Sequence, residues 1–142
     1  MKTVGILLGK KGHDVHSIPP DSMVYDAILK MAKYEIGALL VIDNENIVGI
    51  VSERDYARKI ILQDRSSKTT RVSEIMTPDV VYAEPDYSIE HCMSLMTQKR
   101  IRHLPILREH KIAGMISIGD LVKEIISDQQ QTIEELQKYI TA

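Results

Sequence analysis

The sequence contains no Phe and no Trp, and it has one cysteine among its 142 residues. A single thiol cannot form an internal disulfide, which is typical of a reducing compartment and predicts a cytoplasmic protein. The apolar residues around Cys92 place it on the buried face of a predicted helix, so we expect a structural thiol. Without Phe or Trp, the core must be built from Leu, Ile, Val and seven Met residues, whose unbranched side chains fill irregular spaces.

A strong net charge and long hydrophobic runs are also missing. The 18 basic and 20 acidic residues give a net charge of −2, which does not favour binding to nucleic acid or to a membrane surface. The apolar run at residues 3–8 stops at Gly9 and Lys10, too early for a signal peptide. The longest other run, residues 36–42, is far shorter than a bilayer span. We therefore expect no membrane association.

Signatures of catalysis are absent as well. The five His residues and Cys92 do not have the spacing of metal ligands. No nucleophile and base stand out as a pair, and no phosphate loop of the Gly-x-x-x-x-Gly-Lys type occurs. The short basic segment at residues 9–13 is interpreted as a turn. The sequence therefore predicts neither a metal site nor an enzyme.

What the sequence does contain is an internal duplication. Residues 15–60 recur at residues 80–125 with a constant offset of 65 and no gap. The repeated polar signature consists of Gly49, Ser52 and Asp55 in the first copy and of Gly114, Ser117 and Asp120 in the second. A duplication of this kind predicts two similar units with pseudo-two-fold symmetry, and the groove between them is the natural place for a ligand.

Each copy has the pattern of a β-α-β-β-α unit. A Pro-Asp pair opens a helix whose apolar residues follow the i, i+3, i+4, i+7 spacing of one buried face. Two apolar runs joined by a polar turn then predict a hairpin. The predicted elements are leading strands at 15–18 and 80–83, hairpin strands at 39–42 with 47–52 and at 104–107 with 112–117, and second helices at 56–62 and 121–126. Pro105 cannot donate to a strand ladder, so its strand should be an edge or begin irregularly.

The domain organisation follows from these elements. We predict a first repeat with its lead-in at residues 1–62, a polar linker at 63–71, a second repeat at 72–126 and a C-terminal helix at 127–142. Residues 4–8 resemble residues 72–76, which gives each repeat a similar lead-in. Ile133, Leu136 and Ile140 have helical spacing, so the tail is expected to pack on the body or on another subunit.

With these signatures the chain resembles a tandem pair of cystathionine β-synthase-type (CBS) domains, also called a Bateman module. Residues 49–55 (Gly-Ile-Val-Ser-Glu-Arg-Asp) and 114–120 (Gly-Met-Ile-Ser-Ile-Gly-Asp) match the family pattern Gly-x-x-Ser/Thr-x-x-Asp. Residues 72–77 match the family's lead-in, and residues 102–106 match the strand before the turn. The resemblance covers nearly the whole chain. It implies an α/β (α+β) fold in which two pseudo-symmetric CBS repeats pack sheet to sheet.

The resemblance also implies a function. Modules of this family bind adenosine-containing ligands such as AMP, ADP, ATP, S-adenosylmethionine or NAD(H) in the cleft between the repeats, and they pair into flat homodimers. The chain is most similar to small stand-alone bacterial members, for which we expect AMP and a nicotinamide dinucleotide. The implied protein is a non-catalytic sensor of energy or redox state, in which the ligand biases the conformation or the dimer and an unknown effector protein reads the change.

Two other classes of function remain open. The chain can be a structural or interaction module that has kept the fold and lost the ligand. It can also be a nucleic-acid binder, although the net charge and the missing Phe and Trp argue against base stacking and phosphate tracking.

The repeated carboxylates are the main site candidates. Asp55 and Asp120 lie where a strand gives way to a helix, and a carboxylate there can accept both hydroxyls of a ribose. The same carboxylates can simply cap the helices, and the two roles are compatible. Ser52 and Ser117 can join the free helix amides in a phosphate cradle, or be ordinary turn residues. The signature glycines either admit a close approach of backbone or ligand or mark a bulge.

Basic side chains are the candidates for binding phosphate. Arg54, Arg102 and His103 each flank a signature residue and are favoured for this role. The further phosphate candidates Arg58, Lys59 and Arg100 can equally belong to a solvated charged face.

The other expected ligand neighbours are Ser17, Ile18, Gly37, Ala38, Tyr82 and Pro105. Ser17 and Ile18, like Tyr82 at the matching position, would flank the adenine. Tyr82 departs from the Ser or Thr that the family usually has at this position. Residues 37–38 and 53–54 differ from residues 102–103 and 118–119, so the two sites should not be equivalent.

Overall fold

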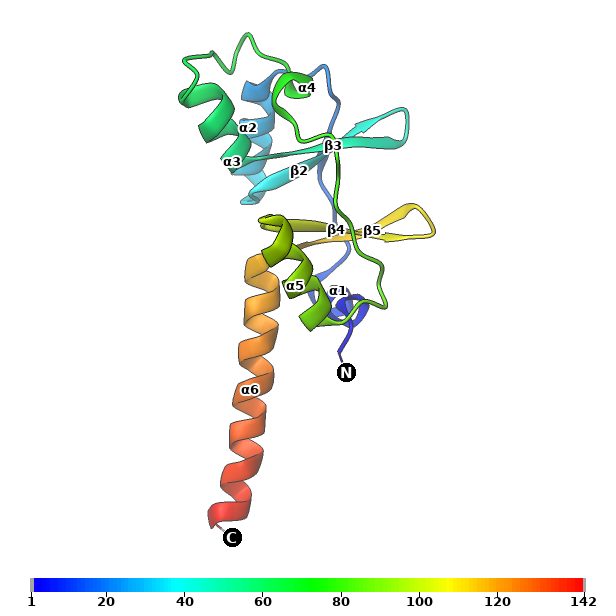
Figure 1. The fold of residues 1–142 in the computed structure, drawn as a ribbon, viewed down its shortest axis with the longest axis vertical. Helices are drawn as coiled ribbons and strands as arrows, with labels where there is room; N and C mark the ends of the chain where they lie inside the picture. The colour runs from blue at the N-terminus through cyan, green and yellow to red at the C-terminus, as the bar shows by residue number, and fades with distance from the viewer. Residues whose placement is uncertain (1, 142) are drawn as a thin grey trace. The chain divides into compact units, whose positions relative to one another are not determined.

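The structure is a computed structural model that describes residues 2–141. The chain divides into two compact units, each built around one copy of the repeat (Figure 1). The first-repeat unit is Val15–Val81. The second-repeat unit combines the residues up to Asp14 with those from Tyr82 onward. The predicted repeat boundaries near residues 62, 71 and 126 are therefore not the boundaries of the packed units, and they remain predictions about the sequence repeats.

The first-repeat unit has a three-stranded sheet in the order β1-β2-β3. Its elements are β1 (Ser17–Ile18), α2 (Val24–Tyr34), β2 (Ala38–Asp43), β3 (Asn46–Ser52), α3 (Glu53–Tyr56), the π-helix η1 (Ala57–Ile61) and α4 (Val72–Ile75). β1 pairs parallel with β2, and β2 pairs antiparallel with β3. The predicted hairpin and the amphipathic helix before it are therefore confirmed, with Val24, Ala27 and Met31 of α2 buried in the core.

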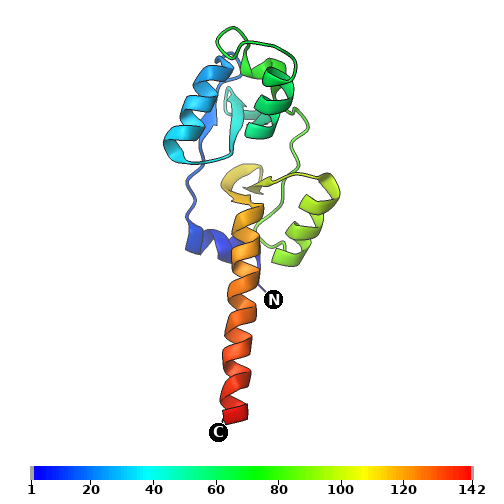
Figure 2. The same cartoon turned by 90° about the vertical axis from the view of Figure 1, so that its left-hand side faces the viewer.

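The second-repeat unit has an antiparallel sheet of two strands. Its elements are α1 (Val4–Lys11), α5 (Ile89–Lys99), β4 (His103–Arg108), β5 (Lys111–Ser117) and α6 (Ile118–Thr141). Cys92 is fully buried on α5, and burial raises the pKa of its thiol to about 11, so the prediction of a structural thiol is confirmed. Figure 2 shows the same elements from a second direction.

The leading strands are shorter than predicted, and the second is a single bridge. Ala83 makes an isolated parallel bridge to Ile106, so the strand predicted at residues 80–83 is wrong. In the first copy the amide of Leu40 donates to the carbonyl of His16 at 3.2 Å. The matching position in the second copy is Pro105, which has no amide hydrogen to donate. The second leading strand therefore loses this ladder bond, and β4 is left at an edge, as Pro105 predicted.

The second helix of each copy begins earlier than predicted. α3 starts at Glu53 and α6 at Ile118, three residues before the predicted starts, because the signature serines cap these helices. After α3 the chain widens into η1, where the amide of Leu62 bonds the carbonyl of Ala57 at 3.1 Å, the i to i+5 spacing of a π-helix. α6 has no break near residue 126 and runs on to Thr141.

Each lead-in helix packs in the unit of the other repeat. In the second-repeat unit, the amide of Val4 bonds the carbonyl of Tyr87 at 2.8 Å, and the amide of Gly5 bonds that of Pro85 at 2.9 Å. These first amides of α1 have no partner within the helix, so the loop before α5 satisfies them.

The first-repeat unit repeats this arrangement with α4. The amide of Val72 bonds the carbonyl of Ser22 at 2.8 Å, and the amide of Ser73 bonds that of Pro20 at 2.9 Å. The two lead-ins therefore dock through matching bonds, and each lies in the unit formed by the other copy of the repeat.

The signature glycines make room for these lead-ins. A Cβ at Gly49 would lie 2.7 Å from Sδ of Met76 and 2.9 Å from the carbonyl oxygen of Thr77. A Cβ at Gly114 would lie 2.5 Å from Cδ2 of Leu8. Each glycine also lies opposite a shift in strand register. Each glycine therefore both marks a bulge and admits a close approach. The group that approaches is a neighbouring segment of the chain, next to or within the lead-in.

Candidate functional site

The signature of the first repeat forms a reciprocal cap at the start of α3. The amide of Asp55 donates to Oγ of Ser52 at 3.2 Å. In return, Oδ2 of Asp55 accepts from the amide of Ser52 at 3.0 Å and from its hydroxyl at 3.1 Å. This is a capping box, with Asp in the place that Glu usually takes. The capping role considered for Asp55 is therefore confirmed.

The second repeat builds the same cap at the start of α6. The amide of Ser117 donates to Oδ2 of Asp120 at 2.8 Å, and the amide of Asp120 donates to Oγ of Ser117 at 3.1 Å. The cap fixes the orientation of both carboxylates without fully burying them, since the side chains of Asp55 and Asp120 remain 13% and 23% exposed. A carboxylate offers about four lone-pair positions, so a capping role leaves acceptor capacity.

The neighbouring chain segments bring further predicted residues to the caps. Ala38 pairs with Ser52 in the sheet register, as His103 pairs with Ser117. The first helical amide, at Glu53, donates to the carbonyl of Gly37 at 3.1 Å. The second copy matches this bond, from Ile118 to Arg102 at 2.9 Å. In each unit, the structure therefore gathers the start of one hairpin strand, the end of the other and the helix cap.

A lysine pairs with each signature carboxylate. Nζ of Lys59 lies 3.2 Å from Oδ1 of Asp55 and donates to the carbonyl of Ile75 at 2.8 Å. Lys59 therefore links η1 to α4 and also neutralises Asp55. These contacts show a more specific role than membership of a solvated charged face.

The partner of Asp120 is Lys11, which the sequence did not identify. Its Nζ lies 2.6 Å from Oδ2 of Asp120 and donates to the carbonyl of Met115 at 2.6 Å. Lys11 ends α1, and Gly12 follows with a φ of 108°, so the segment predicted as a turn is the end of a helix. The basic pair at residues 10–11 was the only signal in the sequence.

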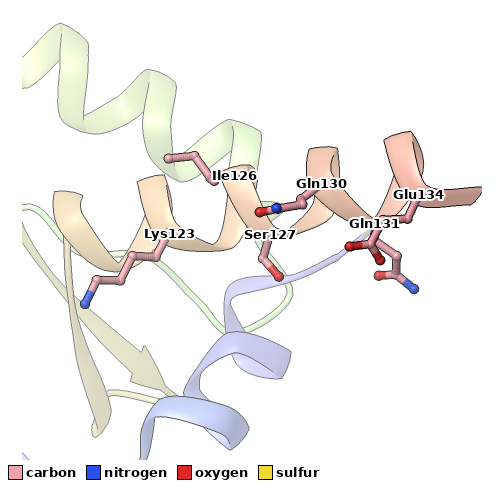
Figure 3. A pocket seen from close by; sticks show the side chains of 6 residues that line it. All are labelled: Lys123, Ile126, Ser127, Gln130, Gln131 and Glu134. Atoms are coloured by element: carbon pink, nitrogen blue, oxygen red, sulfur yellow. The ribbon is translucent and has the colours of Figure 1, made fainter. Parts of the chain in front are cut away.

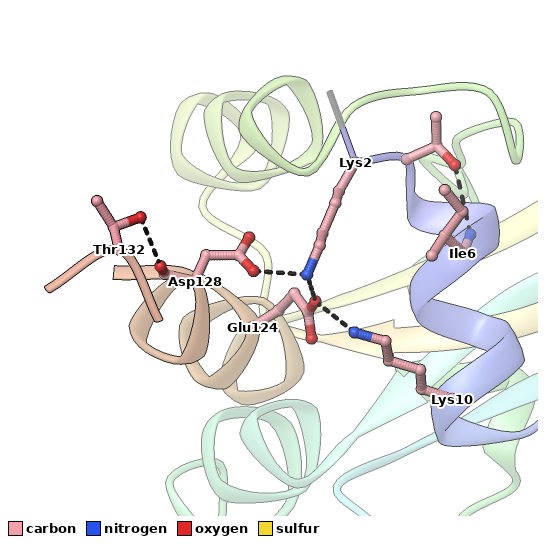
Figure 4. Close-up of polar contacts among 7 residues, drawn as sticks. Lys2, Ile6, Lys10, Glu124, Asp128 and Thr132 are labelled. Atoms are coloured by element: carbon pink, nitrogen blue, oxygen red, sulfur yellow. Dashed lines mark hydrogen bonds and ion pairs between the residues drawn. The ribbon is translucent and has the colours of Figure 1, made fainter. Parts of the chain in front are cut away.

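The repeat position that matches Lys59 is Glu124, and its role is reversed. Oε1 of Glu124 accepts from Nζ of Lys2 at 2.8 Å and from Nζ of Lys10 at 3.0 Å (Figure 4). These two hydrogen bonds lower the pKa of the Glu124 carboxyl. Lys2 and Lys10, together with Lys11, therefore reach the first turns of α6.

The electrostatics around the second cap favour an ionised Asp120. Burial by itself would raise the pKa of Asp120, but the hydrogen bonds from Lys11 and Ser117 hold it below its usual value. Burial, together with the positive charges of Lys11 and Arg102, lowers the pKa of His103. A neutral imidazole at pH 7 follows, so His103 can serve a phosphate as a hydrogen-bond partner more readily than as a cation.

The remaining predicted residues vary in accessibility. Ser17 lies on β1 beside Leu40, while Ile18 is buried in the core. Tyr82 is 44% exposed and Pro105 is buried. Of the basic candidates, Arg58, Arg100 and Arg102 are exposed and Arg54 is partly buried, with Arg100 at the C-terminal end of α5.

The first-repeat unit also has a hollow of about 510 Å³ that reaches the cap. Its lining includes Gly37 and Glu53, which bond each other at the start of α3, and Tyr56 on the same helix. The other lining residues are Ile28, Met31, Ala32, Glu35 and Ile36. Of these, the sequence indicated only Gly37 as a ligand neighbour.

Within residues 2–141, no helix has both the length and the apolar character needed to cross a bilayer. Within the same residues, no three His, Cys, Asp or Glu side chains gather as metal ligands would.

Comparison with known proteins identifies the family. The model of the CBS domain matches residues 12–62 and 72–127. The mitochondrial CBS domain-containing protein CBSX3 of Arabidopsis thaliana is 40% identical over 125 residues, which are 84% of this chain and 61% of CBSX3. The chain therefore spans about three-fifths of that relative.

Solved structures agree with this assignment. A CBS-domain protein from Burkholderia ambifaria MC40-6 superposes with a TM-score of 0.87 at 54% identity, over 90% of this chain and 96% of that one. The CBS domain pair of MJ0100, solved in complex with 5'-methylthioadenosine and S-adenosyl-L-methionine, has a TM-score of 0.80 at 20% identity, over 90% and 98% of the two chains. In each repeat the helix cap lies at the end of a hairpin strand. The chain belongs to the CBS domain family and carries two copies of the domain in tandem.

Proposed function

We propose that this chain is a regulatory module that binds an adenosine-containing nucleotide, AMP, ADP, ATP or NAD(H), and thereby senses energy or redox state. The observation that carries the proposal is the pair of matching caps. Each cap holds its carboxylate, Asp55 or Asp120, in a fixed orientation and leaves part of it accessible. A carboxylate held in this way is suited to accept hydrogen bonds from the two cis hydroxyls of a ribose.

The helix starts beside these carboxylates supply the complementary charge. The positive end of the helix dipole favours phosphate at such positions. Lys11, Arg102 and His103 gather at the cap of Asp120, whereas Lys59 and Arg54 lie in or next to the helix that Asp55 caps. The mixture of one acceptor carboxylate and several donors matches a ligand that carries both a ribose and a phosphate.

The bound MJ0100 pair provides a precedent for the ligand class in this fold. Both of its ligands contain adenosine, and the shared feature is a ribose with two free hydroxyls. AMP and NAD(H) are our preferred ligands because the lysine and arginine side chains favour a ligand with phosphate.

Ligand binding can act as a signal only if the ligand has different affinities for two states of the protein. Lys11 offers a route for such a difference, because a ribose at Asp120 competes with its ammonium, and Lys11 belongs to α1, which is tied to α6. We propose that the output is a change in α1 and α6, read through a homodimer or by an effector protein in the cytoplasm.

Isothermal titration calorimetry of the purified chain with AMP, ATP and NADH tests this function. We expect a saturable heat with at least one of the three. Silence with all three at millimolar concentration would contradict the proposal. A mass spectrum of any small molecule that purifies with the protein would identify the natural ligand independently.

A second candidate function is an interaction module that no longer binds nucleotide. The observation in its favour is that both signature carboxylates already have a helix cap and a lysine as partners. A preparation without nucleotide absorbance and without a calorimetric response would support it.

A further inference from the structure

The second half of α6 lies exposed to solvent. Leu121 and Glu124, in its first turns, are buried. From Gln129 to Ile140 every side chain is exposed. In both ribbon views α6 extends well beyond the other elements of its own unit (Figures 1 and 2). A helical segment of about 12 residues is only marginally stable in water without tertiary packing.

The apolar side chains of this helix follow a heptad repeat. Ile126, Ile133 and Ile140 take position a, and they are 55%, 55% and 81% exposed. Val122 and Leu136 take position d, at 42% and 56% exposed. The spacing of three and four residues is that of a coiled-coil seam. We call the surface formed by these five residues and Gln129, the remaining d position, the α6 seam.

Beyond Lys123, which takes position e beside Val122, the charges of α6 avoid this seam. From Glu124 onward the charged residues lie at positions b, c and f, on the outer side of the helix: Glu124, Asp128, Glu134, Glu135 and Lys138. Positions e and g between residues 125 and 139, which flank a seam, carry no charge. Two identical copies of this surface can therefore meet without like charges facing each other.

The face beside the seam is different in character. A groove of about 400 Å³ runs along it and is lined by Ile126 together with polar side chains (Figure 3). Those polar side chains are Lys123, Ser127, Gln130, Gln131 and Glu134. This face suits contact with water, so the seam is the part of α6 that needs a partner. Insertion into a lipid surface is disfavoured, because Lys138 is the single basic residue beyond Lys123.

We propose that the α6 seam packs against the same seam of a second copy of this chain, as a parallel two-stranded coiled coil. Ile takes the three a positions and Leu136 takes one of the three d positions, and Ile at a with Leu at d favours two strands. In the parallel arrangement each seam residue faces its own copy, so the amide of Gln129 meets another amide that can both donate and accept. An antiparallel pair would instead place Gln129 opposite an apolar residue.

The area of the seam is consistent with this occupant. Covering five apolar side chains that are about half exposed or more removes on the order of 500 Å² per chain, against roughly 800 Å² per partner in a standard interface. The uncharged e and g residues would add to the contact. The pairing does not depend on the proposed nucleotide site, and its test needs no ligand.

Cysteine cross-linking in the chain of 142 residues tests the pairing directly. The native thiol of Cys92 is fully buried and its pKa is raised to about 11, so it does not compete with an introduced cysteine. We expect Gln129→Cys and Leu136→Cys, both at d positions, to give a covalent dimer under mild oxidation. Gln131→Cys, at an outward f position, is the matched control and should stay monomeric on a non-reducing gel.

The cross-links also report the arrangement. Equal cross-linking at residues 129 and 131, or none at either d position, would overturn the proposal. A disulfide between Gln129→Cys and Ile133→Cys in a mixture of these two variants, with neither variant linked to its own copy, would show an antiparallel pair and overturn the parallel one.

Disruption of the seam provides a second readout. The double substitution of Ile133→Lys and Leu136→Lys should reduce the cross-linking of Gln129→Cys at least tenfold, whereas Glu134→Lys, on the outer side, should not. Both lysines replace exposed side chains, so the body should keep its folded circular dichroism signal. Undiminished cross-linking in the double variant would also overturn the proposal.

Discussion

The ammonium of Lys11 lies 2.6 Å from Oδ2 of Asp120, so a residue of the first lead-in neutralises the signature carboxylate of the second repeat. Asp55 meets Lys59, four residues further along its own chain segment, at 3.2 Å. The two repeats therefore keep the same Ser-Asp cap and differ in where the neighbouring cation comes from. This difference is a physical reason to expect that the two predicted ligand sites are not equivalent.

Replacement of Lys11 should lower stability in a pH-dependent way. The folded-state pKa of Asp120 lies below its usual value, so its contribution to stability is present above that usual value, near pH 4, and is lost as the pH falls through the folded-state pKa. We expect Lys11→Gln to cost about 0.5–1 kcal/mol at pH 7, since the pair is partly solvated. Urea unfolding at pH 7 and pH 3 measures the difference.

The control for this prediction is Lys99→Gln, which removes the same charge from an exposed site. It should leave the free energy of unfolding within about 0.5 kcal/mol of the parent. A cost of Lys11→Gln that is as large at pH 3 as at pH 7 would show that the ion pair is not its cause.

Charge and capping can be separated at the signature carboxylates. Asp55→Asn and Asp120→Asn keep a side-chain oxygen that can cap the helix but remove the negative charge. If the carboxylates bind ribose, nucleotide affinity should fall at least fivefold, in line with the stronger hydrogen bonds of charged groups. Calorimetry with the ligand that binds the parent protein measures this effect.

Asp79→Asn, a change of the same charge at an exposed position outside the signature, should bind as the parent does. If both Asp55→Asn and Asp120→Asn bind nucleotide as tightly as the parent, the two carboxylates do not bind ribose and their role is to cap the helices. Thermal unfolding of the same samples shows whether the caps survive.

The signature glycines should not tolerate a methyl group. Gly49→Ala should lower the free energy of unfolding by about 1–3 kcal/mol, because the new Cβ would meet the backbone oxygen of Thr77, which cannot move alone. Gly114→Ala should cost less, because its contact is the end of the Leu8 side chain. Urea unfolding of the two variants measures both values.

Gly9 provides a control within a helix. Nothing lies within 4 Å of a Cβ added there, so Gly9→Ala should stabilise α1 by about 0.5–1 kcal/mol. Equal losses at Gly9 and Gly49 would mean that the close approach of the lead-in is not the reason for the glycine.

The effect of Pro105 on the second leading strand can be reversed. Pro105→Leu introduces the residue found at the matching position of the first repeat and restores an amide hydrogen. We expect this amide to become protected from hydrogen exchange, as the amide of Leu40 should be in the same sample through its bond to His16. An unprotected amide at residue 105, with Leu40 protected, would show that something other than the missing donor shortens this strand.

The sequence predicted the parts of the fold that depend on local pattern. The duplication, the hairpins and the helix that buries Cys92 follow from the spacing of apolar residues and turn signals. The cap at each signature was one of the considered roles, because a Ser three residues before an Asp is a local motif. The unbroken α6 could also have been predicted, since no Gly or Pro follows Gly119.

What the sequence did not predict depends on packing between distant segments. Lys11 and Asp120 are 109 residues apart, and nothing in the sequence links them. The exchange of the lead-ins was equally hidden, because residues 4–8 and 72–76 resemble each other and fit either unit by pattern. The assignment of α1 and α4 is determined by tertiary contacts, such as those with the loops before α5 and α2.

The exchange of α1 and α4 has a consequence for folding during synthesis. The first-repeat unit is a continuous piece of chain, so it can fold as soon as residue 81 has left the ribosome. α1 is made before the first-repeat unit, whereas the rest of the unit to which α1 belongs is made after the first-repeat unit. Until β5 and the start of α6 have been made, α1 cannot complete its packing within its own unit, and its apolar residues Leu7 and Leu8 stay uncovered.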